Sequence, residues 1–193
     1  MDRSTKIAWA ITGSAILAYL LLRKSTDGGS VLNTTKTYNP EYDMRLNDNL
    51  PRGYYNNNPL NIRISKDQWQ GKVTPNTDGA FEQFIDMAHG YRAALIILRN
   101  YIKKYNCNTL RKIITRWAPP SENNTESYIK NVSRLSGVGE NEIIAPTDKE
   151  RLVKIAYAMS ISENGYKDKA QQDIKQRYDL PNMEIINEGW RLI

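Results

Sequence analysis

The chain has 193 residues, which is enough for one domain with an appendage and too short for two ordinary domains. The formal charge is +6, but the first 24 residues carry four basic side chains against one acidic one, and the remainder mixes both signs. A remainder this mixed gives little reason to expect nucleic-acid binding. A single cysteine, Cys107, excludes an internal disulfide, and a single histidine, His89, excludes a histidine-rich zinc site. No metal or cofactor is predicted.

An uncharged apolar run extends from Ile7 to Leu22, with basic residues on both sides. As a helix it would be about 24 Å long, somewhat short of a hydrocarbon core of roughly 30 Å, but flanking Lys and Arg side chains can reach the interface. We interpret residues 1–24 as a membrane anchor formed by a transmembrane helix. A cleaved signal peptide and a buried core helix are the alternatives, although Arg23 and Lys24 stand where a cleavage site would have small residues.

Residues 25–50 are turn-rich and lack a sustained apolar period, which predicts a flexible linker before a domain at 51–193. Apolar residues recur at three and four positions over 89–105 and 110–117, which predicts helices there. Further helices are expected from a cap at Thr125 to Gly137, and from a capping box at 147–150 to Asn164. One or two short helices are expected over 168–193. Alternation at Leu60, Ile62 and Ile64 predicts a small β-hairpin in an otherwise mostly α domain.

Glu163 is the leading candidate for a catalytic residue. At 100° per residue it continues the apolar face that carries Leu152, Ala156 and Met159, in the last turn before a glycine. A carboxyl group there is partly desolvated, which favours its protonated form, and a protonated carboxyl can act as a general acid. The alternative is a helix-end glutamate whose side chain turns out into water.

Amide and aromatic side chains suggest a sugar-binding surface, because sugar hydroxyls pair with amides and sugar rings stack on aromatic faces. The candidates are the Asn-rich turn at 56–61 and the segment from Trp117 to Thr125 that joins two helices. The turn is equally explained by asparagines that bond their own backbone. Glu122 is a second carboxylate and the backup for Glu163, although an acidic residue just before a helix also favours the helix dipole.

Four motifs in order resemble a group of phage and prophage virion proteins with a lysozyme-like or lytic-transglycosylase-like domain. They read R-G-Y-Y-N-N-N-P-L-N-I-R, F-E-Q-F-I-D-M-A-H-G-Y-R, R-W-A-P-P-S-E-N-N-T-E-S-Y-I-K-N-V and A-M-S-I-S-E-N-G, within residues 51–166. The resemblance implies an α+β lysozyme-like fold and cleavage of the β-1,4 bond between N-acetylmuramic acid and N-acetylglucosamine. Glu163 would be the acid, and the substrate-binding residues would be Asn57, Asn58, Asn61, Trp117 and Tyr128.

In lytic transglycosylases a Glu-Ser-Gly motif comes first in the chain, and the other parts of the site follow it. In this chain the similar Glu163-Asn164-Gly165 comes last, so the resemblance suggests a circular permutation. That arrangement requires Glu163 to face the same cleft as Asn57, Asn58 and Tyr128. The expected partners are a peptidoglycan strand, a lipid membrane through residues 7–22, and other virion proteins. The expected location is a virion, with a bacterial inner membrane facing the periplasm as the alternative. A non-catalytic virion or glycan-binding module is the rival function. If the protein is instead an inverting hydrolase, it needs a second carboxylate, and the candidates are Glu82, Asp86 and Glu122.

Overall fold

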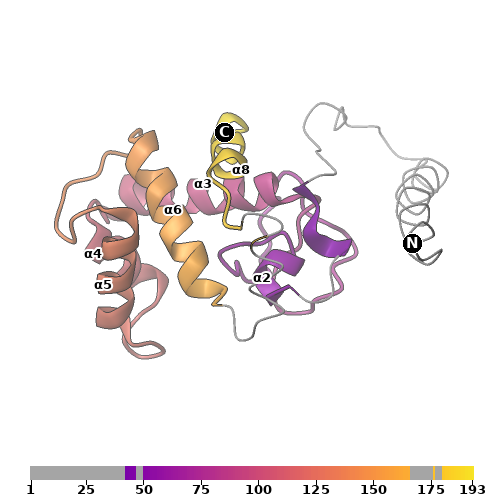
Figure 1. The fold of residues 1–193 in the computed structure, drawn as a ribbon, viewed down its shortest axis with the longest axis horizontal. Helices are drawn as coiled ribbons and strands as arrows, with labels where there is room; N and C mark the ends of the chain where they lie inside the picture. Colours follow the sequence, from indigo (N-terminus) through magenta and orange to yellow (C-terminus); the bar gives the residue numbers. More distant parts are fainter. Residues whose placement is uncertain (1–41, 47–49, 166–175, 177–179) are drawn as a thin grey trace, which may run out of the picture. The chain divides into compact units, whose positions relative to one another are not determined.

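The structure, a computed structural model, describes residues 42–46, 50–165, 176 and 180–193. Contacts along the chain divide it into two units, Met1–Thr37 and Tyr38–Ile193, and every described residue belongs to the second. Within that unit Figure 1 shows helices packed around one another, with loops grouped beside α2. The ordered elements are η3 (Met44–Leu46), α2 (Arg52–Tyr55), α3 (Met87–Tyr105), α4 (Leu110–Trp117), α5 (Thr125–Ser136), α6 (Lys149–Glu163) and α8 (Met183–Arg191).

The longest helix, α3, lies at the centre of the packing. Its Asp86 cap accepts a hydrogen bond from the His89 backbone, and Leu95 and Leu98 are fully buried on its apolar stripe. The last helix, α8, packs against α3 (Figure 1), and a Cβ at Gly189 would lie 2.8 Å from the Ala88 carbonyl oxygen. The glycine therefore lets the two helix backbones approach closely.

Helix α6 connects the two sides of the domain, because it packs against α5, α8 and α3. The predicted helices at α3, α4, α5 and α6 are confirmed, but two of the predicted caps are wrong by one residue. Asn124, rather than Thr125, caps α5 by accepting from the Ser127 backbone. Asp148 alone caps α6 by accepting from the Arg151 backbone, so the expected capping box does not form.

The predicted β-hairpin, and with it the α+β fold class, is wrong, because the described residues contain helices and no β-strand. One side chain accounts for this: Asn58 accepts from the Ile62 backbone N–H and donates to the Glu82 carbonyl, so these two backbone groups do not pair with each other as a strand ladder would require. Positive φ angles at Gly71 and Gly79 turn the chain between the short extended pieces. What remains is three isolated antiparallel bridges, Arg63–Phe81, Lys72–Phe84 and Thr109–Ile143.

The predicted transmembrane helix receives no support. Among the helices of the described part of the chain, none has the length and apolar character needed to cross a bilayer, and residues 1–24 lie outside that part. The end of the predicted linker packs on the domain. Met44 is buried, and its backbone N–H donates to Asn57 Oδ1 at 2.8 Å.

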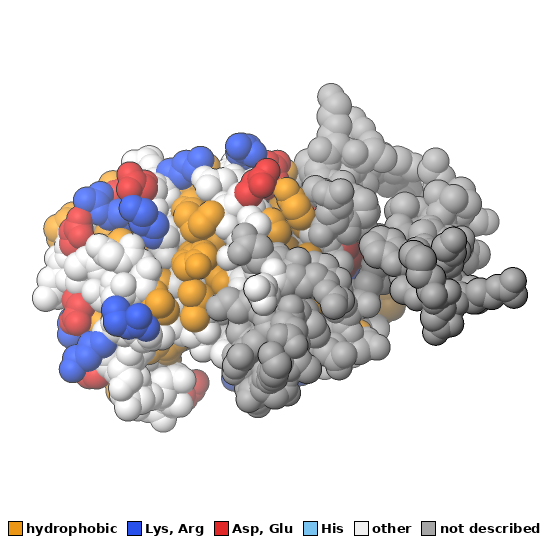
Figure 2. Space-filling view, viewed as in Figure 1, with side chains coloured by type: hydrophobic (Ala, Val, Ile, Leu, Met, Phe, Trp, Pro, Cys, Tyr) orange, Lys and Arg blue, Asp and Glu red, His pale blue; other side chains and the backbone are white. Residues whose placement is uncertain are grey.

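Charges of both signs lie side by side on the surface. On the face drawn in Figure 2, Lys and Arg side chains alternate with Asp and Glu side chains around a strip of hydrophobic ones. Several of these charges form ion pairs, and Arg111 alone pairs with both Glu126 and Glu140. The mixed charge seen in the sequence is therefore also mixed in space on this face.

Candidate active site at the end of helix α6

Glu163 is the last residue of α6, and its half-buried side chain is the centre of a hydrogen-bonded cluster. Tyr128 Oη on α5 donates to Glu163 Oε1 at 2.7 Å, and Trp117 Nε1 at the end of α4 donates to the same oxygen at 3.0 Å. Asn61 Nδ2 from the Asn-rich loop donates to Glu163 Oε2 at 3.3 Å. Four residues singled out in the sequence thus meet at one carboxyl group.

The two oxygens of Glu163 have different surroundings. An indole N–H can only donate, and burial raises the pKa of the Tyr128 phenol well above its usual value, with the nearby Glu163 charge raising it further. Tyr128 therefore stays a neutral hydroxyl that can donate. Oε1 already accepts two hydrogen bonds, whereas Oε2 accepts a single longer one. When the carboxyl group is protonated, Oε2 is therefore the oxygen that can carry the proton.

Asn164 links the end of α6 to the Asn-rich loop through hydrogen bonds. The sequence did not lead us to assign this residue to the site. Asn164 Nδ2 donates to the Pro59 carbonyl at 2.6 Å and to the Ser160 carbonyl at 2.9 Å. A Cβ at Gly53 would collide with Asn164 Oδ1 and lie 2.8 Å from Asn61 Oδ1. The absence of a side chain at Gly53 thus makes room for both amides. Two features of the sequence could have indicated that Asn164 belongs to the site: it directly follows a helix-end glutamate, and a glycine lies close to the Asn-rich loop.

One turn earlier, Ser160 is held by two buried tyrosines. Tyr91 Oη on α3 donates to Ser160 Oγ at 3.1 Å, and Tyr54 Oη on α2 donates to the Ser160 carbonyl at 3.4 Å. Just before the carboxylate, Asn131 Nδ2 on α5 donates to Ser162 Oγ at 2.9 Å. These bonds from α3, α2 and α5 hold the last turn of α6 in place, so the backbone that carries Glu163 is firmly positioned.

Asn57 and Asn58, two predicted sugar-binding residues, are fully buried and serve the loop itself. Asn57 has a φ of 52° and donates to Asp43 Oδ1 at 2.8 Å and to the Phe84 carbonyl at 3.0 Å. Asn58 accepts from the Ile62 backbone at 2.9 Å. Both have 0% exposure, so neither is placed to meet a ligand. Tyr128 meets the permutation requirement, because it bonds Glu163, whereas Asn57 and Asn58 do not meet it. Asn61, which the requirement did not name, contacts Glu163 instead.

The candidates for a second carboxylate do not join the cluster. Glu82 has 0% exposure and pairs with Lys72 Nζ at 2.9 Å. Asp86, equally buried, caps α3 and contacts His89 Nδ1 at 2.8 Å. The side chain of Glu122, the backup catalytic residue, is exposed on the loop between α4 and α5 and forms no hydrogen bond within the described part.

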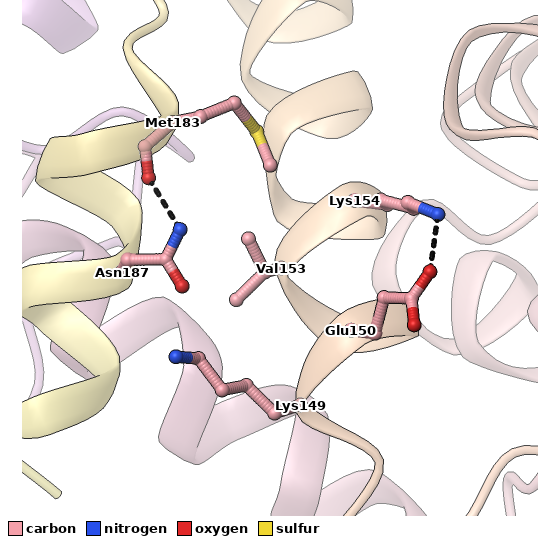
Figure 3. A pocket seen from close by; sticks show the side chains of 6 residues that line it. All are labelled: Lys149, Glu150, Val153, Lys154, Met183 and Asn187. Carbon is pink, nitrogen blue, oxygen red and sulfur yellow. Dashed lines mark hydrogen bonds and ion pairs between the residues drawn. The ribbon is translucent and has the colours of Figure 1, made fainter.

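A pocket lies at the opposite end of α6, where it faces α8 (Figure 3). Its polar groups are largely satisfied by one another. Lys154 pairs with Glu150 at 2.6 Å, and Asn187 Nδ2 donates to the Met183 carbonyl at 2.8 Å, as the dashed lines in Figure 3 mark. The pocket has no acid–base pair poised for chemistry, so the candidate site is the Glu163 cluster. Within the described residues, no group of three or more His, Cys, Asp or Glu side chains is arranged to hold a metal ion.

A known phage protein is similar to this chain over most of its own length. Protein P5 of Pseudoalteromonas phage PM2 is 38% identical over 131 residues, which cover 66% of this chain and 80% of that protein. The chain belongs to the family of Protein P5. No protein-family profile matches the chain.

Membership of the Protein P5 family bears out the predicted resemblance in its coarser form, that of a bacteriophage protein. The name of Protein P5 describes no activity. The chemistry of this family member is therefore argued from the cluster around Glu163.

Proposed function

We propose that this phage protein is a glycosidase that cleaves the β-1,4 bond between N-acetylmuramic acid and N-acetylglucosamine in peptidoglycan, with Glu163 as its acid and base. The observation that carries the proposal is the arrangement of donors around one half-buried carboxyl group. Trp117 and Tyr128 both donate to Oε1, while Oε2 accepts only the longer bond from Asn61. Such a carboxyl group is oriented by one oxygen and can exchange a proton through the other.

In the first step, Glu163 Oε2 gives its proton to the glycosidic oxygen as the bond from that oxygen to the muramic acid C1 breaks. The sugar then carries oxocarbenium character, and Glu163 is left ionised. The hydrogen bonds from Trp117 and Tyr128 stabilise that ionised state, because bonds to a charged acceptor are stronger than bonds to a neutral one. Water is partly excluded at this half-buried position, which strengthens the effect.

In the second step, the same carboxylate takes back a proton. If it comes from the 6-hydroxyl of the muramic acid, that oxygen bonds to C1 and closes a 1,6-anhydro ring, as in a lytic transglycosylase. An inverting hydrolase would instead need a second carboxylate roughly 6.5–9.5 Å away to activate water. Glu82 and Asp86 are both buried in structural pairs, which favours the transglycosylase.

The test compares the full-length chain with its Glu163→Gln variant on purified peptidoglycan. A glutamine keeps an oxygen that accepts from Trp117 and Tyr128, so the fold should persist while release of soluble fragments is abolished. Glu150→Gln is the matched control, because Glu150 lies on the same helix and pairs with Lys154 in an exposed ion pair. Mass spectrometry of the products separates anhydro ends from reducing ends. Undiminished release by Glu163→Gln would remove Glu163 from catalysis.

A non-catalytic glycan-binding module is the second candidate, and the lack of a second carboxylate in the cluster favours it. The same experiment separates the two, because such a module would bind insoluble peptidoglycan without releasing fragments. For the location, we propose association with the virion, which purified particles would reveal. Binding of residues 7–22 to lipid stays a prediction, and flotation with liposomes tests it.

A further inference from the structure

An exposed arginine lies over two tyrosines beside the Glu163 cluster. The guanidinium carbon of Arg116, on the last turn of α4, is 3.5 Å from the ring centroid of Tyr105 and 5.0 Å from that of Tyr101. The two tyrosine rings stand edge to face at 6.3 Å on the last turns of α3. We call these three residues the Arg116 cluster. Tyr105 is 53% exposed, so the cluster faces solvent.

The charge of Arg116 has no acidic counterpart in the described part of the chain, where no carboxylate lies within ion-pair distance of it. The other arginine of α4 differs, because Arg111 pairs with Glu126 and Glu140, each at 2.5 Å. Burial raises the pKa of Tyr101, so its phenol stays neutral and does not compensate the charge. Cation–π contacts with two rings restrict the guanidinium and leave its N–H edge available for an anion.

The Arg116 cluster is continuous with the candidate active site. The rings of Tyr101 and Trp117 lie 6.5 Å apart at a tilt of 54°, and Trp117 is the residue that donates to Glu163 Oε1. Only the Trp117 ring thus separates the Arg116 cluster from Glu163. A polymer bound across Glu163 would have its neighbouring substituents in reach of Arg116.

The planar fork of a guanidinium matches the geometry of a carboxylate or a phosphate, which it can bind through two parallel N–H groups. In peptidoglycan, the carboxylates near the bond to be cleaved lie on the peptide stems that the muramic acid residues carry. We propose that Arg116 binds a carboxylate of the peptide stem on the glycan strand held at Glu163. This inference rests on the proposed function, and it makes stem-bearing peptidoglycan the preferred substrate over bare glycan strands.

The experiment compares full-length wild type, Arg116→Gln and Lys112→Gln on intact peptidoglycan and on glycan strands from which an amidase has removed the stems. Lys112 is exposed one turn earlier on α4 and bonds Asn108 at 3.2 Å, so its variant removes the same charge outside the Arg116 cluster. On intact peptidoglycan, Arg116→Gln should raise the half-saturating substrate concentration about threefold to tenfold with the maximal rate unchanged. Lys112→Gln should match wild type, and on stem-free strands all three should agree.

Co-sedimentation with insoluble peptidoglycan provides a readout that does not depend on cleavage. If wild type cleaves nothing but its binding still depends on Arg116 and on the stems, the glycosidase proposal fails and the stem contact stands. Equal behaviour of Arg116→Gln and wild type on intact peptidoglycan would overturn the stem contact. An equal loss with and without stems, or an equal loss in Lys112→Gln, would also overturn it, since either result indicates general attraction to the polymer.

Discussion

The hydrogen bond from Tyr128 to Glu163 offers a measurable test of the catalytic role proposed for the cluster. Tyr128→Phe keeps the ring and removes only the donor at 2.7 Å, which is the shortest of the three bonds to the carboxyl group. A hydrogen bond to a charged group is worth about 1.5–3 kcal/mol. Since Trp117 still donates to the same oxygen, we expect the lower end of that range, which corresponds to about a 10-fold to 30-fold lower maximal rate.

The assay is release of soluble fragments from purified peptidoglycan, with thermal unfolding measured in parallel. Tyr157→Phe is the matched control, because Tyr157 is a half-buried tyrosine of α6 whose hydroxyl has no hydrogen-bond partner among the described residues. That control should retain the wild-type rate. In a Glu163→Gln background, Tyr128→Phe should add no further loss, since the two residues act as a unit. A rate for Tyr128→Phe within twofold of wild type would refute the role assigned to this bond.

Two further predictions concern the loop that supports the site. Arg52 holds the pKa of Asp78 well below its usual range, so ionised Asp78 stabilises the fold above the unfolded pKa of about 3.9, and this stabilisation is lost as pH falls below that value. Asp78→Asn should therefore lower the melting temperature at pH 7 and differ less from wild type at pH 3; an equal difference at both would contradict this. Gly53→Ala should cost about 1–3 kcal/mol in denaturant unfolding, because its Cβ collides with Asn164, and should also slow fragment release. Gly165→Ala, which meets nothing within 4 Å, is its control, and equal stability of the two variants would count against the collision.

The helices were predictable because their signals are local. Leu95 and Leu98 recur at helical spacing, and the structure buries both on α3. Glu163 was predictable as a candidate site residue for the same reason, since its position on the apolar face of α6 follows from the sequence alone. A cap is harder to place, because Asn124 and Thr125 are neighbouring residues that both suit the position.

What the sequence could not reveal depends on distant partners. The loop asparagines look equivalent, yet Asn58 is buried under its own loop and Asn61 reaches Glu163. Which asparagine faces outward is decided by contacts with Glu82 and α6, and these have no local pattern. The predicted hairpin failed similarly, because the Asn58 amide pairs with the Ile62 N–H and the Glu82 carbonyl, which a ladder would have joined to each other.

The partners of Glu163 are far from it along the chain. Trp117 and Tyr128 are 46 and 35 residues away, Asn61 is 102 residues away, and the bond from Asn164 to Pro59 spans 105. Bringing such distant segments together has an entropic cost, because the loops must close before the stabilising contacts can form. During synthesis, the three residues that donate to the carboxyl group, Asn61, Trp117 and Tyr128, are made before Glu163 itself. The proposed glycosidase activity would thus appear only after Glu163 has been synthesised and has packed against these donors, and on heating it should vanish together with the fold.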